Sequence, residues 1–113
     1  MKRSNKEKVL PDVAFRLKHL GEYIRVARKR RKMTMAEVGE RLNLGYQTVV
    51  RVEKGDPGVS MAAYLSALWL FDLDKQFSES IHPDRDEVGK ALEYSRLPER
   101  VGSKRITRSK HDF

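Results

Sequence analysis

Four polar side chains lie close together near the middle of the sequence, and their types favour recognition by hydrogen bonding. They are Tyr46, Gln47, Thr48 and Arg51. Together they offer phenol, amide, hydroxyl and guanidinium groups, which is a mixture of donors and acceptors. A face that is merely solvated would carry simple charges instead. The set therefore predicts a surface that binds a polar partner.

Residues that could catalyse a reaction or ligate a metal are few and scattered. The chain has 113 residues and no cysteine, which excludes disulfides, thiolate catalysis and cysteine zinc sites. Its three histidines, at positions 19, 82 and 111, lack the spacing of metal ligands. Asp84, Asp86 and Glu87 favour the start of a helix over a metal site, and neither a nucleophile elbow nor a phosphate-binding glycine loop occurs. We expect no enzymatic activity, no metal and no cofactor.

The polar set belongs to the second of two short helices predicted between residues 34 and 55. Thr34 and Glu37 form a capping-box pattern, in which each side chain satisfies a backbone N–H group of the first turn. Met35, Val38 and Leu42 then follow on one helical face. The pattern predicts a first helix that begins just after Thr34.

A turn at residues 43–45, Asn-Leu-Gly, interrupts the helical pattern, and a second helix begins near Tyr46. Val49 and Val52 mark its apolar side, and Gly55 ends it. Two short helices joined in this way form a helix-turn-helix unit, whose second helix enters the major groove of DNA. An ordinary helical hairpin is the alternative.

Charge is distributed unevenly along the chain. The net charge of +8 divides into +9 over residues 1–32 (12 Lys/Arg, 3 Asp/Glu), −5 over residues 33–95 (6 and 11) and +4 over residues 96–113 (6 and 2). Basic ends beside a helix-turn-helix unit suggest phosphate contacts, because neutralising phosphates releases condensed counterions. The alternative is that such ends are disordered and solvating. For the tail after Pro98 both interpretations stay open.

The flanking segments predict further helices. A helix from Asp12 to about Arg31 carries apolar residues at a period near 3.6, and Gly21 is a candidate for a break in it. Ser60 begins a helix that is apolar almost all round, so some of its aromatic side chains are candidates for a dimer or partner contact. These candidates are Tyr64, Trp69 and Phe71, with a fully buried role as the alternative.

No apolar run is long enough to span a membrane, and the basic N-terminus lacks the apolar segment of a signal peptide. We expect a cytoplasmic, nucleoid-associated protein. The expected organisation is a basic N-terminal arm at residues 1–11, a DNA-binding domain at residues 12–81, and a helical extension with a basic tail at residues 82–113.

Residues 20–74 resemble the Xre/Cro family of helix-turn-helix repressors. The matching positions are Arg28, Thr34, Val38, Gly39, Leu42, Leu44, Thr48, Val49, Val52, Glu53 and Gly55. The resemblance implies an all-α fold, with a five-helix Xre/Cro-like DNA-binding domain, an additional C-terminal helix and flexible basic ends. Met35 stands where the family usually has a phosphate-contacting glutamine, and Asn43 replaces the usual turn glycine.

The resemblance also implies roles for individual residues. Arg28 is expected to pair with Glu53 and so to fix the angle of the second helix. Base contacts carry over to Tyr46, Gln47 and Arg51, with Thr48 and Val50 close to the DNA. Phosphate contacts are expected from Lys29, Arg30, Lys32, Thr34 and Lys54.

A narrower resemblance, in the segments after Glu53, is to HipB-like antitoxins. It implies a homodimer that represses its own operon at a near-palindromic operator and restrains a HipA-like kinase toxin. The basic tail ending in Phe113 is a candidate toxin-binding segment. The alternatives are a stand-alone Xre-family repressor and, less favoured, nonspecific binding of RNA or of a membrane surface.

Overall fold

The computed structural model describes residues 8–96, and this part of the chain is helical apart from its turns. It contains six α-helices and a short 3-10 helix, with no strand between residues 8 and 96. The predicted all-α class is therefore confirmed. Most of the predicted arm at residues 1–11, the tail after Arg96 and the candidate contact residue Phe113 lie outside the described residues.

Two compact units divide the chain between Phe77 and Ser78. This division falls four residues before the boundary expected from the sequence. The helix α5 (Asp74–Glu79) runs across it, and Phe77 still packs on the core of the first unit.

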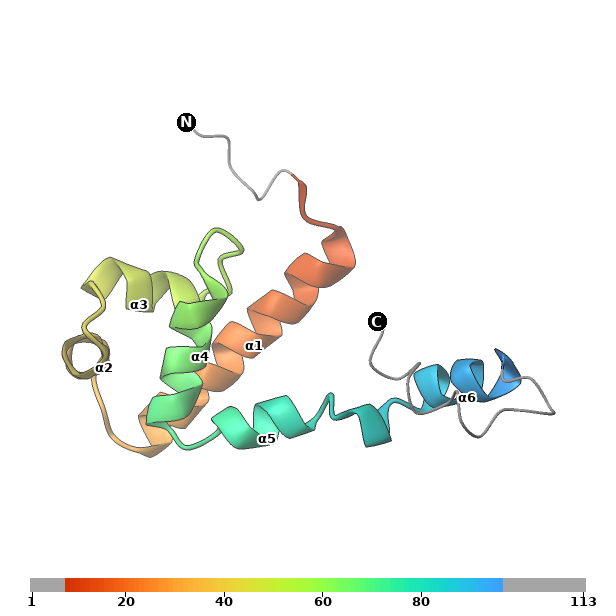
Figure 1. Ribbon diagram of the computed structural model, residues 1–113. Helices are drawn as coiled ribbons and strands as arrows, with labels where there is room; N and C mark the ends of the chain where they lie inside the picture. Colours follow the sequence, from red (N-terminus) through yellow and green to blue (C-terminus); the bar gives the residue numbers. More distant parts are fainter. Residues whose placement is uncertain (1–7, 97–113) are drawn as a thin grey trace. The chain divides into compact units, whose positions relative to one another are not determined.

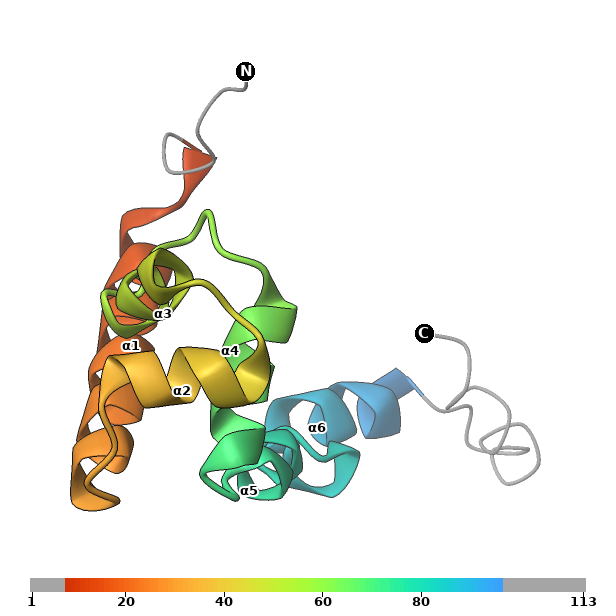
Figure 2. The ribbon, with the colours of Figure 1, turned by 90° about the vertical axis from the view of Figure 1, so that its left-hand side faces the viewer.

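The first unit is built on four helices, which Figures 1 and 2 show with α1 running its length and the others gathered along it. They are α1 (Pro11–Arg30), α2 (Met35–Leu42), α3 (Tyr46–Glu53) and α4 (Met61–Leu70). All four helices and the residue that follows α4 contribute to one apolar core. Its buried members are Ile24, Ala27, Val38, Val49, Val52, Ala63, Tyr64, Ala67, Leu68 and Phe71.

Side chains begin two of these helices as the sequence predicts. The Thr34 hydroxyl accepts the Glu37 N–H at 3.0 Å, and the Glu37 carboxylate accepts the Thr34 N–H at 2.7 Å. This is the predicted capping box of α2. The Ser60 hydroxyl accepts the Ala63 N–H at 3.2 Å and begins α4 in the predicted way.

The four helices also end alike, each with a left-handed residue followed by a backbone N–H that reaches back five residues. The left-handed residues are Lys32, Asn43, Gly55 and Asp72, and the closing N–H groups belong to Met33, Leu44, Asp56 and Leu73. Asn43, at φ 58° and ψ 43°, takes a left-handed geometry that asparagine tolerates. Each of these hydrogen bonds satisfies a backbone carbonyl that would otherwise lack a partner in the last helical turn. The chain can therefore leave each helix through a short connection.

Gly21 lies within an unbroken α1, so the candidate break does not occur there. A Cβ atom at Gly21 would lie 2.6 Å from the backbone oxygens of Val52 and Glu53 and from the Gly55 nitrogen. A Cβ at Gly55, where φ is +71°, would collide with the backbone of Leu17. Two glycines thus let the end of α3 touch α1 backbone to backbone.

The aromatic residues in and after α4 correct our expectation of a contact surface. Tyr64 is 3% exposed and Phe71 is 1% exposed, so both belong to the core. Trp69 is 64% exposed and stays available for a contact. Both rings therefore pack among the short helices that form the core.

The second unit contains the 3-10 helix η2 (Pro83–Arg85) and α6 (Glu87–Arg96). Asp86 caps α6 by accepting the Gly89 N–H at 2.9 Å, so one of the three acidic residues does begin a helix. No residue of α6 is buried, and Val88, Leu92 and Tyr94 are exposed. Among residues 8–96, no helix combines the length and the apolar character that a membrane crossing requires.

We predict that Gly21→Ala destabilises the first unit by about 1–2 kcal/mol. Alanine gains up to about 1 kcal/mol in helix propensity, but a Cβ pressed against three backbone atoms costs more than that. Urea denaturation followed by circular dichroism measures the difference. Gly45→Ala is the matched control, because a Cβ at Gly45 meets nothing within 4 Å. Equal effects of the two substitutions would contradict the close contact.

Candidate nucleic-acid interface

The helix α3 separates its side chains into two faces. Val49 and Val52 are buried in the core, as the sequence predicts. On the other side, Tyr46, Gln47 and Arg51 are exposed. The remaining candidates, Thr48 and Val50, are half-buried at the edges of the exposed face. The five predicted base-contacting residues therefore share one short helix, with three of them on its open face.

A buried ion pair ties the end of α3 to the end of α1. Arg28 Nε donates to Glu53 Oε2 at 2.6 Å, and Arg28 Nη2 donates to Glu53 Oε1 at 3.0 Å. The two side chains are only 9% and 7% exposed. A bidentate pair of this kind allows one relative orientation of the planar groups. The angle between α1 and α3 is therefore constrained by chemistry as well as by packing.

The third side-chain nitrogen of Arg28 also donates a hydrogen bond. Its Nη1 donates to the Met33 carbonyl at 2.8 Å, which joins the pair to the connection between α1 and α2. The hydrogen bond to Glu53 raises the pKa of Arg28 above its ordinary value and outweighs the opposing effect of burial. Arg28 thus stays charged while it holds three elements together.

The basic end of α1 contains structural and free charges side by side. Arg31 donates to the carbonyl oxygens of Ala27 and Phe71, both at 2.9 Å, and its guanidinium lies 5.3 Å from the centre of the Phe71 ring. The neighbouring Lys29, Arg30 and Lys32 are exposed. Sequence reasoning missed the structural role of Arg31, because a cation near a helix end has many possible partners.

Two further candidates for phosphate contacts lie at other helix ends. Thr34 is exposed at the start of α2, where its hydroxyl oxygen is engaged in the capping box. Lys54 is exposed at the end of α3. All five predicted phosphate-contacting residues are therefore exposed, and they come from the ends of three helices.

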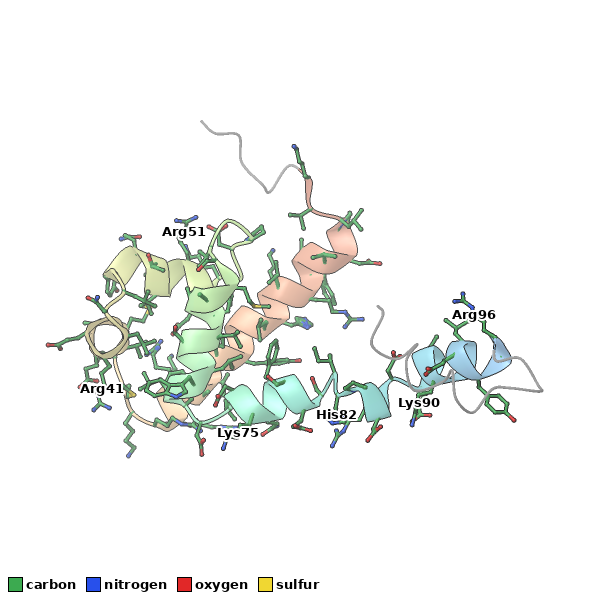
Figure 3. The ribbon with its side chains drawn as sticks, in the orientation of Figure 1. Arg41, Arg51, Lys75, His82, Lys90 and Arg96 are labelled. Atoms are coloured by element: carbon green, nitrogen blue, oxygen red, sulfur yellow. The ribbon has the colours of Figure 1, made fainter. Side chains whose placement is uncertain are left out.

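Arg51 is not a free side chain. Its Nε donates to Asp56 Oδ2 at 2.8 Å, and it points outward beside the turn that follows α3 (Figure 3). Sequence reasoning missed this pair. An Asp-Pro-Gly sequence gives no sign that the carboxylate also reaches back over one helical turn.

The same turn is attached to the core through Tyr64. The Tyr64 hydroxyl donates to the Asp56 carbonyl at 2.7 Å. Burial, and next the nearby Asp56 charge, raise the pKa of Tyr64 to about 12, while Arg51 acts in the opposite sense. The phenol therefore keeps its proton, and its donated hydrogen bond, at neutral pH.

A row of exposed aromatic rings on α1 was also absent from the sequence predictions. Phe15 and His19 have ring centres 4.3 Å apart, and His19 and Tyr23 have ring centres 6.0 Å apart. Their spacing of four residues is the only signal of this row, and no partner for it follows from that spacing.

Comparison with protein-family models, with curated proteins and with solved structures finds no match to this chain. Among residues 8–96, no three or more His, Cys, Asp or Glu side chains come together as a group that could hold a metal ion. What the described side chains do offer is an exposed polar helix face held on a constrained frame.

We predict that Glu53→Ala lowers the free energy of unfolding by roughly 3–5 kcal/mol, because it leaves Arg28 charged, buried and alone. Replacing both partners, as Arg28→Met with Glu53→Leu, should recover most of this loss. Urea denaturation of the three proteins provides the measurement.

Glu22→Ala supplies the control for this prediction. Glu22 and Arg25 form an ion pair at 3.5 Å on α1, with side chains 55% and 43% exposed. Loss of such a surface pair should cost less than about 0.5 kcal/mol. A similar loss for Glu22→Ala and Glu53→Ala would show that the buried pair has no special role.

Proposed function

We propose that the chain is a sequence-specific, double-stranded-DNA-binding transcriptional repressor without enzymatic activity. In this proposal α2 and α3 form a helix-turn-helix unit, and α3 enters the major groove. The observation that carries the proposal is the division of α3, with Val49 and Val52 buried and Tyr46, Gln47 and Arg51 exposed. The resemblance to the Xre/Cro family, seen in residues 20–74, supports the same assignment.

The exposed side chains have the chemistry that base recognition needs. Arginine can donate two hydrogen bonds to O6 and N7 of guanine, and glutamine can form two with adenine. Valine can contact the methyl group of thymine. In this proposal Arg51, Gln47 and Val50 take these roles, with Tyr46 and Thr48 beside them.

Exposed cations near helix ends support the phosphate contacts. Lys29, Arg30, Lys32 and Lys54 are assigned to the DNA backbone together with the Thr34 hydroxyl. Such contacts orient a protein on the duplex without reading its sequence, and they make binding depend on salt.

The rigid attachment of α3 gives the proposal its physical basis. A base contact requires donors and acceptors at fixed positions, so a helix that rocked on its support would discriminate poorly. The Arg28–Glu53 pair and the close contact at Gly21 both constrain the last turn of α3 against α1. Side chains projecting from α3 therefore start from a constrained backbone.

A homodimer follows from the size of the recognition surface. Eight helical residues extend about 12 Å, which covers only about four base pairs in one groove. Two copies bound to successive major grooves, about 34 Å apart, would double the site and favour a near-palindromic operator. Dimerisation is part of the proposal for this reason.

We predict that the protein enriches one near-palindromic motif from a pool of randomised duplexes. Arg51→Ala should cost about 1–3 kcal/mol on the enriched site and relax the preference at one base pair of each half-site. Lys29→Ala and Arg30→Ala should weaken binding evenly across sequences and reduce the salt slope by about 1 each. Selection followed by titration at several salt concentrations tests all three variants.

The contrasting outcome is binding without preference. If the wild-type protein enriched no motif and bound scrambled duplexes, RNA and anionic vesicles equally well, nonspecific electrostatic attraction would replace the proposal. Equal losses for Arg51→Ala and Lys29→Ala on random DNA would contradict the division between base and phosphate contacts.

We propose a second role, as an antitoxin that binds a HipA-like kinase toxin. This role rests on the resemblance to HipB-like proteins, and the exposure of Trp69 favours it. A tryptophan that is 64% exposed on a helix is an anchor of the kind that protein interfaces use. A stand-alone repressor is the alternative.

We predict that a kinase-like protein copurifies in stoichiometric amount after nuclease treatment at low salt. Trp69→Ala should reduce its recovery at least tenfold, a loss typical of a residue that dominates an interface. Tyr23→Ala, which removes another exposed aromatic side chain, should have little effect. Recovery of the homodimer alone would favour the stand-alone repressor.

A further inference from the structure

The carboxylate of Asp56 forms an ion pair with Arg51 on the exposed face of α3. Arg51 Nε donates to Asp56 Oδ2 at 2.8 Å. The Arg51 side chain is 48% exposed, whereas the Asp56 side chain is only 13% exposed. The arginine is thus the outer partner of the pair and the aspartate is the inner one.

Asp56 is itself fixed by hydrogen bonds at both its backbone and its side chain. Its backbone N–H donates to the Arg51 carbonyl at 3.0 Å, and its carbonyl accepts the Tyr64 hydroxyl at 2.7 Å. Its second carboxylate oxygen, Oδ1, accepts the Gly58 N–H at 2.8 Å. An aspartate fixed at backbone and side chain offers Arg51 an acceptor at a defined position.

Gly58 leaves room for the guanidinium beside this acceptor. A Cβ atom at position 58 would lie 3.1 Å from Arg51 Nη2 and 3.2 Å from Asp56 Oδ1. A side chain at this position would therefore crowd both members of the pair. The turn supplies a charge partner on one side of Arg51 and open space on another.

We propose that Asp56 is a positioning and specificity-determining residue, which holds Arg51 by its Nε so that the terminal nitrogens can reach a guanine. This inference rests on the proposed function. A guanidinium has five N–H groups in a planar fork, so one can be held while others donate to O6 and N7. A side chain that is already ordered also loses less freedom when it binds.

Asp56 could instead act only by neutralising the charge of Arg51, and the effect of removing its carboxylate on DNA binding distinguishes the two roles. If the carboxylate served only to neutralise Arg51, its removal would strengthen binding to every sequence through the added positive charge. If it positions Arg51, its removal weakens the preference at one base pair and leaves the other positions unchanged.

Asp56→Asn is the test, since it keeps the shape and the Oδ1 acceptor. Glu22→Gln is the matched control, because it makes the same charge change at an exposed ion pair on a different helix, α1. The probe is a pool of randomised duplex DNA, with bound sequences counted. We expect wild type and Glu22→Gln to enrich one motif, while Asp56→Asn loses about tenfold of its discrimination at one base pair per half-site.

Two outcomes count against different claims. If wild type enriches no motif, the proposed function fails and the inference fails with it. If wild type enriches a motif and Asp56→Asn retains the same preference at every position, the inference alone is overturned. Circular dichroism of each variant reports whether it is folded.

A second test uses the wild-type protein without DNA and so does not depend on whether Asp56→Asn folds. The Nε–H proton of Arg51 should exchange with water at least tenfold more slowly than that of Arg25, whose ion pair is longer, uses Nη1 instead of Nε and involves a carboxylate that is 55% exposed. NMR of arginine side chains resolves the two. Equal exchange rates would show that Asp56 does not hold Arg51 and would overturn the inference.

Discussion

The first unit depends on the ion pair between Arg28 and Glu53. Removing two charges from water is costly, and the cost is recovered only when both groups are fully hydrogen-bonded. Arg28 meets this condition with two bonds to Glu53 and one to the Met33 carbonyl. The same geometry fixes the orientation of α3 relative to α1. The ion pair therefore contributes orientation even though its burial costs free energy. The core valines of α3 could tolerate small rotations that this pair does not allow.

Backbone contacts at the glycines complement the ion pair. Gly21 and Gly55 let α1 and the end of α3 approach until their main chains touch. Side-chain packing between helices normally leaves an axis separation of 8–10 Å, and only a missing side chain permits a closer approach. One end of α3 is therefore constrained by a bidentate pair and by a steric contact. Its exposed face can vary without disturbing either.

Local signals predicted much of this fold. The capping box of Thr34 and Glu37 identified the start of α2, and the spacing of Val49 and Val52 identified the buried side of α3. The burial of Tyr64 could not be predicted, because a helix that is apolar almost all round has no periodicity to reveal its inner face. The Asp56 contact with Arg51 also escaped prediction, since it depends on how a turn folds back. Gly21 stayed helical because packing outweighs propensity there.

The closures at the helix ends have a consequence for how the chain reaches this structure. Each of the four helices is stopped by a hydrogen bond that spans only five residues, and the Arg28–Glu53 pair spans only 25. Contacts between residues near in sequence cost little loop-closure entropy, and proteins rich in them fold within microseconds to milliseconds. Synthesis adds roughly 5–20 residues per second, so folding at such rates would be faster than the addition of a single residue.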